Sequence, residues 1–76
     1  NMAVSYKKLF HMMSERDMSN AQLMDQAGFS ANIITRMKRG SYISLESVES
    51  ICRAMCCGED DILEFIPDEH EEVNKQ

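Results

Sequence analysis

Short stretches of helical periodicity, separated by cap residues and glycines, constrain the fold of this chain more than any other feature. The first carries apolar residues at helix spacing, namely Tyr6, Leu9, Phe10 and Met13. This spacing predicts an amphipathic helix over about residues 4–16. Ser19 followed by Gln22 matches the capping-box pattern, in which the two side chains satisfy backbone donors at a helix start. A second helix is therefore predicted over about residues 20–27, with Gly28 at its end.

Three further helices follow from the same reasoning. Ser30 is predicted to cap a third helix over about residues 31–38. A fourth begins after Ser44, stops near Gly58 and carries one apolar stripe, namely Leu45, Val48, Cys52 and Met55. A short fifth helix is opened by acidic residues, turns three apolar side chains inward and ends at Pro67; these residues are Glu59, Asp60, Asp61, Ile62, Leu63 and Ile66. Strand-like alternation is absent, so we expect an all-α domain of five helices.

Length and composition limit the chain to one small domain. Its 76 residues contain 43% apolar residues, three glycines and one proline, which suits a packed helical domain. We expect the domain over residues 3–66 and an acidic, disordered tail over residues 67–76. No run is apolar and long enough for a transmembrane helix, and no secretion leader is evident. We therefore expect a cytoplasmic protein with no membrane partner.

The net charge of −5 seems to argue against nucleic acid, but the charge is unevenly placed. Residues 59–76 carry a net charge of −7, whereas residues 1–58 carry +2. Three bases and no acid lie between Gly28 and Gly40. Phosphates respond to such a local patch, because salt screens charges beyond roughly 8 Å. The patch is small, so we expect modest sequence-independent affinity for nucleic acid.

The stretch from Asn20 to Gly40 predicts two short helices joined by a sharp turn at Gly28. Projection of the third helix at about 100° per residue separates two arcs. The apolar arc holds Ile33, Ile34 and Met37, and the opposite arc holds Asn32, Thr35, Arg36 and Arg39. Asparagine pairs bidentately with adenine and arginine with guanine, and no carboxylate lies on the polar arc to repel phosphates. We therefore predict that this helix reads double-stranded DNA. An ordinary amphipathic surface helix is the alternative.

The same residues resemble the helix-turn-helix of the Cro/C1-type repressor family. Counting from Asn20, that family favours glycine ninth, a branched aliphatic fifteenth and an aliphatic eighteenth, which here are Gly28, Ile34 and Met37. The following residues resemble the family's fourth and fifth helices, so the resemblance covers about residues 4–66. One departure is Met24, where the family usually has alanine. The resemblance implies a five-helix fold of the lambda-repressor type. A second departure is size, because many family members carry a further dimerisation or ligand domain, which we do not expect in this small chain.

The resemblance also implies roles for individual residues at the interface with DNA. Asn32 and Arg36 are predicted to read bases in the major groove, and Asn20 to contact a phosphate or brace a base-reading side chain. Ser30 and Ala31 would lie close to the groove and the backbone, with Ala31 able to meet a thymine methyl. Thr35, Lys38 and Arg39 would hold phosphates. We expect a transcriptional regulator, with repression favoured over activation, that binds a palindrome as a homodimer. The fifth helix is our guess for the dimer surface.

Other function classes receive less support. No nucleophile with a histidine and an orienting acid is present, so no enzyme, cofactor or small-molecule effector is predicted. Cys52, Cys56 and Cys57 lack the spacing of a metal site and are interpreted as buried thiols, with Cys57 the most exposed candidate. Two alternatives stay open. One is a protein-interaction module such as an antitoxin or antirepressor, which the acidic tail would suit. The other is a sensor that responds through its cysteines.

Overall fold

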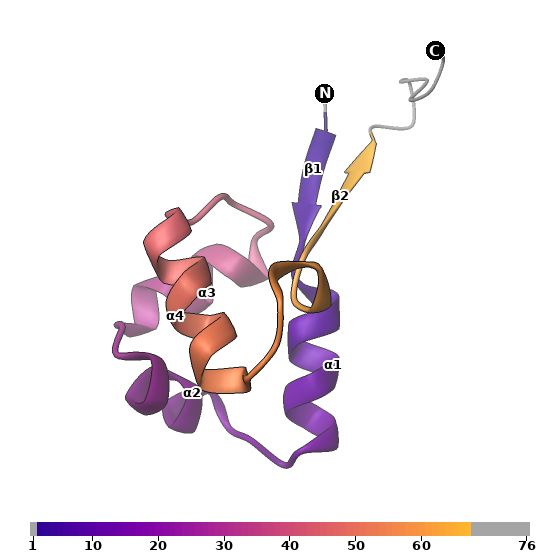
Figure 1. Cartoon of the computed structure of the whole chain (residues 1–76). Helices are drawn as coiled ribbons and strands as arrows, with labels where there is room; N and C mark the ends of the chain where they lie inside the picture. The colour runs from indigo at the N-terminus through magenta and orange to yellow at the C-terminus, as the bar shows by residue number, and fades with distance from the viewer. Residues whose placement is uncertain (1, 68–76) are drawn as a thin grey trace.

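Within residues 2–67, the fold consists of four α-helices, one short 3-10 helix and a two-stranded antiparallel sheet, in the order β1, α1, α2, α3, α4, η1, β2 (Figure 1). The protein was studied as a computed structural model, which describes residues 2–67. The helical elements are α1 (Lys7–Glu15), α2 (Asn20–Ala27), α3 (Ala31–Lys38), α4 (Leu45–Met55) and η1 (Glu59–Asp61). The strands are β1 (Met2–Ser5) and β2 (Glu64–Pro67). No helix in this range is long and apolar enough to cross a membrane.

The capping residues explain where most of the helices begin. Ser19 forms the complete capping box, since it accepts from the Gln22 amide while the Gln22 side chain accepts from the Ser19 amide. Ser44 likewise accepts from the Ser47 amide at the start of α4. Ser30 has the extended backbone of a cap, but its side chain makes no capping bond. Ser30 is therefore the N-cap residue of α3, as predicted, but it caps the helix without a side-chain hydrogen bond.

Residues in the left-handed region end two of the helices. Gly28 has φ +79° and donates its amide to the Met24 carbonyl, as a glycine after a helix should. Cys56, at φ +57°, closes α4 in the same way with a bond to the Cys52 carbonyl. Helix α4 therefore ends at Met55 and not near Gly58, where it was predicted to end.

The apolar core draws on all four described α-helices and on residues near both ends of the described chain. Eleven residues are buried: Val4, Tyr6, Leu9, Met13, Leu23, Ile34, Met37, Val48, Ile51, Met55 and Ile62. Three hydrogen bonds tie the elements around this core. Tyr6 Oη donates to the Ser41 carbonyl at 2.9 Å, Arg16 to the Met55 carbonyl at 3.0 Å and Lys8 to the Asp60 carbonyl at 2.8 Å. Together they hold the start and end of α1 against the loop after α3, the end of α4 and η1.

The ends of the chain differ from the all-α prediction of five helices. Residues 2–5 form β1 and α1 starts only at Lys7, although one helix over 4–16 was predicted. The predicted fifth helix is replaced by η1 and β2, and Pro67 ends a strand. The two strands pair Ala3 with Ile66 and Val4 with Phe65. This pairing is more stable here than a local helix, because it brings β-branched and aromatic residues together across the two strands.

Three side chains also lie elsewhere than predicted. Leu45 is 84% exposed, because the first residue of α4 projects beyond the core, while Val48, Ile51 and Met55 form the buried stripe. Ile66 is 41% exposed on the sheet and does not turn inward. Cys56 is the exposed thiol, whereas Cys52 and Cys57 are half-buried. The predicted tail lies outside the described residues, apart from Pro67.

Candidate nucleic-acid interface

Helices α2 and α3 form the steep two-helix unit that the sequence predicts. The turn between them begins at Gly28, where a Cβ would meet no atom within 4 Å, so the glycine is needed for its backbone conformation alone. Leu23 of α2 is fully buried, and Ile34 and Met37 of α3 are also buried, with only a few per cent of their surface exposed. These side chains fix α3 across α2. Met24 lies half-buried against the core, so the bulk of methionine at this position is absorbed by packing.

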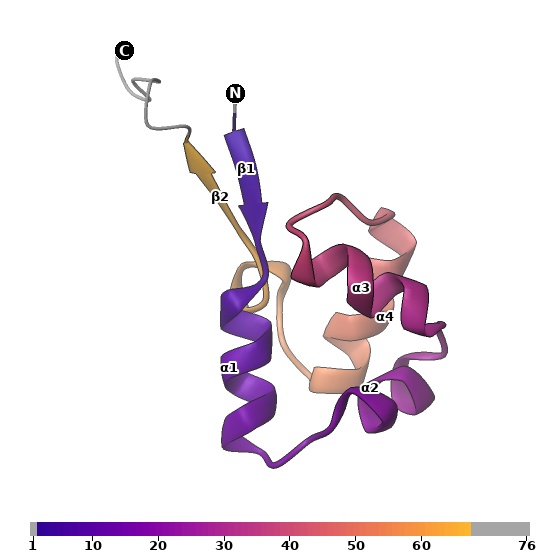
Figure 2. The same cartoon turned by 180° about the vertical axis from the view of Figure 1, so that it is seen from behind.

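Burial of one face leaves the other face of α3 at the surface of the molecule. Figure 2 shows α3 on the near side, with α4 behind it. All but one of the predicted contact residues are exposed, namely Ser30, Ala31, Asn32, Thr35, Arg36, Lys38 and Arg39. Asn20, at the first position of α2, is half-buried. The structure therefore brings the α3 residues together on one exposed surface, with Asn20 at the start of the neighbouring helix.

The charge on this surface is uniform. Within residues 2–67, no ion pair joins Arg36, Lys38 or Arg39 to a carboxylate; the described pairs are Lys8–Glu64, His11–Glu15 and Arg53–Glu49. Arg36 and Lys38 lie in the last turn of α3, where their positive charges also complement the negative end of the helix dipole. An anion that approaches α3 thus meets hydrogen-bond donors and positive charge.

The backbone at the start of α3 adds further donors. The first amides of any helix have no partner inside it, and here the Ser30 hydroxyl makes no capping bond. The amides of Ala31 and Asn32 and that hydroxyl are therefore open to a phosphate or a base. The hydroxyl of Thr35 donates to the Ala31 carbonyl at 3.3 Å, which leaves its oxygen as an acceptor on the exposed face.

Arg36 has a partner that the sequence did not predict. Its Nε and Nη2 donate to the Tyr42 carbonyl at 3.2 and 2.6 Å, and the remaining guanidinium N–H groups point to no described acceptor within residues 2–67. The bond joins α3 to the loop before α4. That loop and the start of α4 carry two exposed apolar side chains, Tyr42 and Leu45. The sequence analysis did not predict that either side chain lies at the surface. The signal for Leu45 was present, because Ser44 as the N-cap makes Leu45 the first residue of α4.

Three comparisons with known proteins agree with this geometry. The sequence profile of the Cro/C1-type HTH DNA-binding domain matches residues 8–68. The uncharacterized HTH-type transcriptional regulator YozG of Bacillus subtilis strain 168 is 35% identical over 60 residues, which cover 76% of this chain and 71% of YozG. The crystal structure of the transcriptional regulator VanUg superposes with a TM-score of 0.82 at 31% identity, covering 88% of this chain and 89% of VanUg.

Proposed function

Because the chain belongs to the Cro/C1-type helix-turn-helix DNA-binding family, we propose that it is a sequence-specific regulator of transcription that inserts α3 into the major groove. Membership of the family supports DNA binding and a role in regulation. The observation that carries the finer proposal is the exposed face of α3, where hydrogen-bond donors and positive charge gather without a described carboxylate partner. A major groove admits one α-helix and presents a distinct pattern of donors and acceptors at each base pair.

Base reading is assigned to Asn32 and Arg36, which lie four residues apart on the same face of α3. Asn32 would pair with adenine, and Arg36 with guanine through the N–H groups of its guanidinium that do not donate to Tyr42. Ala31, at the start of α3, would contact a thymine methyl. All three are exposed, so base contact requires no unfolding of the core.

Phosphate contacts are assigned to the surrounding residues. Lys38 and Arg39 supply positive charge at the end of α3, and Ser30 and Thr35 supply hydroxyl groups near its start and middle. Asn20 lies at the first position of α2, where helix amides and its side chain both suit a phosphate. These contacts would fix the register of α3 without reading sequence.

Repression through a homodimer is the mode of action that we propose. One helix of eight residues reads only a few base pairs, so two copies on a palindrome would supply the affinity that one copy lacks. Their half-sites would lie about one helical turn apart, roughly 34 Å. A dimer bound over a promoter would block polymerase in the cytoplasm, and this role involves no catalytic step, cofactor or small-molecule effector.

Selection of bound duplexes from a random pool tests this function. The native protein should enrich one motif with two-fold symmetry. Arg36→Ala and Asn32→Ala should each relax one position of the motif and weaken binding to it by about tenfold. Arg53→Ala is the matched control, because Arg53 is exposed but already paired with Glu49. Enrichment of no motif would instead favour the protein-interaction alternative. Enrichment of the same motif by the Asn32 and Arg36 double variant would overturn the assignment of base reading to these two residues.

A further inference from the structure

The end of α4 brings two of the three cysteines of the chain together. Cys56 ends the helix at φ +57°, and its amide donates to the Cys52 carbonyl. The amide of Cys57 donates to the same carbonyl at 3.0 Å. Helices that end in this way turn the residue after the left-handed position back against the last turn of the helix. Here the two residues that meet are Cys52 and Cys57.

The backbones of this pair are close enough for a disulfide bond. The 3.0 Å bond between the Cys57 amide and the Cys52 carbonyl, added to the covalent bond lengths, keeps the two Cα atoms within about 7 Å, beyond which no disulfide closes. The two thiols also hydrogen-bond to each other. The Cys56 thiol is exposed and donates instead to the Arg53 carbonyl at 3.8 Å. The geometry therefore selects one pair among the three cysteines.

We propose that Cys52 and Cys57 form a reversible intrachain disulfide by exchange with a small disulfide such as oxidised glutathione. All three cysteines are free thiols in the structure, so the pair starts in its reduced form. Cys52 and Cys57 are half-buried, which leaves each within reach of a small reagent. The inference goes beyond the proposed function and does not depend on it.

The two thiols take different parts in the exchange. Cys57 is the attacking group, because its sulfur accepts the hydrogen bond from the Cys52 thiol and the positive charge of Arg16 favours its thiolate. The Cys57 thiolate bonds to one sulfur of oxidised glutathione and releases the other half as a thiolate. The thiolate of Cys52 then attacks the Cys57 sulfur and releases the second glutathione. Two protein thiols are thereby oxidised, one glutathione disulfide is reduced to two thiols, and the two protein protons pass to the released thiolates.

The surroundings of the pair make this exchange slow at neutral pH. Burial raises the pKa of both thiols above the ordinary value of 9.0, and the Asp61 carboxylate of η1 raises it further. Glu59 acts in the same direction on one thiol and Cys56 on the other, whereas Arg16 opposes them at Cys57. The thiolate is the attacking form, so the rate should rise about tenfold for each unit of pH below the pKa.

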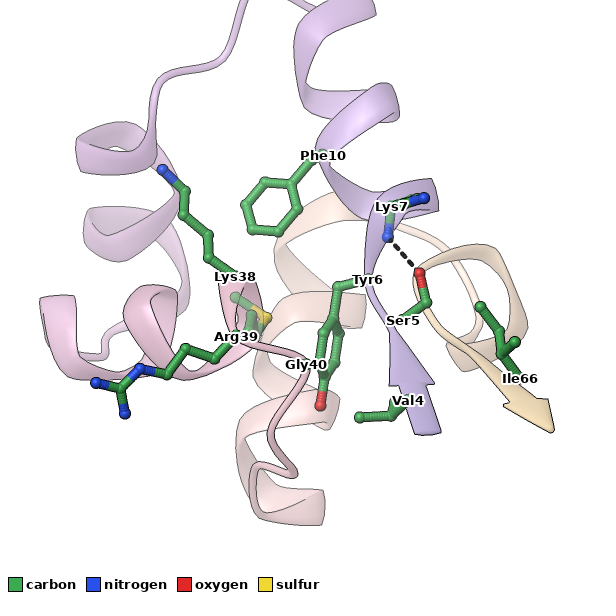
Figure 3. Close-up of a pocket in the computed structure, with 10 residues that line it drawn as sticks. Val4, Ser5, Tyr6, Lys7, Phe10, Lys38, Arg39, Gly40 and Ile66 are labelled. Carbon is green, nitrogen blue, oxygen red and sulfur yellow. Dashed lines mark hydrogen bonds between the residues drawn. The ribbon is translucent and has the colours of Figure 1, made fainter. Parts of the chain in front are cut away.

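The pair lies apart from the proposed contacts with DNA. It sits at the end of α4, where the chain leads into η1, whereas the loop after α3 joins the start of α4 (Figure 1). A cavity of about 380 Å³ lies beside the end of α3, where Figure 3 shows Lys38 and Arg39, and none of the three cysteines lines it. Oxidation of the pair thus modifies no residue of the proposed interface.

Incubation of the reduced full chain with oxidised glutathione, followed by acid quenching, alkylation and peptide mapping by mass spectrometry, tests the proposal. Native protein should lose two of its three thiols, carry no glutathione and be alkylated at Cys56. Cys56→Gly is the matched control, because glycine suits the positive φ and the variant should still lose two thiols. Cys52→Ser should stop at a mixed disulfide between Cys57 and glutathione. Excess reduced glutathione should restore all three native thiols.

Several results would overturn the proposal. These are three thiols that persist in excess oxidised glutathione, a native mixed disulfide at Cys57 that does not resolve, a bond that involves Cys56, or a bond that reduced glutathione does not open. A rate that does not rise between pH 7 and about pH 8 would overturn the assignment of the attacking thiolate. If a variant fails to fold, the peptide map of native protein decides alone. None of these results bears on DNA binding, which the selection of duplexes tests separately.

Discussion

Arg36 links the exposed face of α3 to the loop that follows it, because two of its nitrogens donate to the Tyr42 carbonyl. A lysine in its place would keep the charge but lack the planar fork that makes both bonds. The residue therefore combines a positioning role for residues 40–44 with its proposed contact to a base. Lys38 and Arg39 have no comparable bond among the described residues, so their charged groups are open to the phosphate contacts that we propose for them.

Burial of three weak acids ties stability to pH on the alkaline side. Burial raises the pKa of the Cys52 and Cys57 thiols above the ordinary value of 9.0, and that of the Tyr6 phenol above 10.0. The folded protein thus holds these protons more tightly than the unfolded chain does. Their contribution to stability is complete below pH 9.0 and is lost as pH rises through the folded-state pKa values.

We predict that the free energy of unfolding falls as pH rises above 9.0. Urea unfolding at a series of pH values measures it. Replacing Cys52 and Cys57 with alanine should remove the part of the fall that begins near 9.0, and Tyr6→Phe the part that begins near 10.0. An unchanged slope in the variants would show that these three groups do not govern the alkaline behaviour. The raised pKa values also make the thiols of Cys52 and Cys57 less reactive at neutral pH, since the thiolate is the reactive form.

Helices α2 and α3 each begin after a serine N-cap, but the two serines differ in their capping bonds. Ser19 accepts from the Gln22 amide, whereas the Ser30 side chain makes no capping bond. Ser19→Ala should therefore lower the free energy of unfolding by about 1 kcal/mol, and Ser30→Ala by much less. Chemical denaturation of both variants checks this. Equal losses would mean that Ser30 caps α3 in solution.

The helices could be predicted from sequence because their signals are local. Periodicity, the capping box at Ser19 and the glycine at 28 all act within a few residues. The strands could not be predicted in this way, since β1 and β2 pair residues at opposite ends of the described chain, such as Val4 and Phe65. Four residues are too few for alternation to stand out, and Ile66 at helical spacing from Leu63 looked like part of a helix.

The exposed face of α3 could also be predicted, because a helix with one apolar stripe leaves the opposite residues outside. The loop could not. Tyr42 contributes its carbonyl to Arg36 through the backbone, which carries no sequence signal. Leu45 belongs to an apolar stripe whose first turn extends past the core. Such details depend on where neighbouring elements end.

For the whole molecule, the net charge of −5 limits the contribution of general electrostatics to DNA binding. With Lys38 and Arg39 as the cations on phosphates, log K against log salt should have a slope of about −2 per subunit. Lys38→Ala should reduce its magnitude by about one, while Arg53→Ala should leave the slope unchanged. Fluorescence anisotropy on a labelled duplex at several salt concentrations measures this. An equal change in both variants would contradict the assignment of Lys38.

The central claim is that the exposed face of α3 contacts DNA, and amide NMR spectra recorded during titration with the selected duplex test it most directly. We predict that the largest chemical-shift changes occur at residues 30–39 and at Asn20, with smaller ones at residues 40–45. Amides of α1 should change little. Changes concentrated on α1 or η1, with residues 31–38 unaffected, would contradict the account.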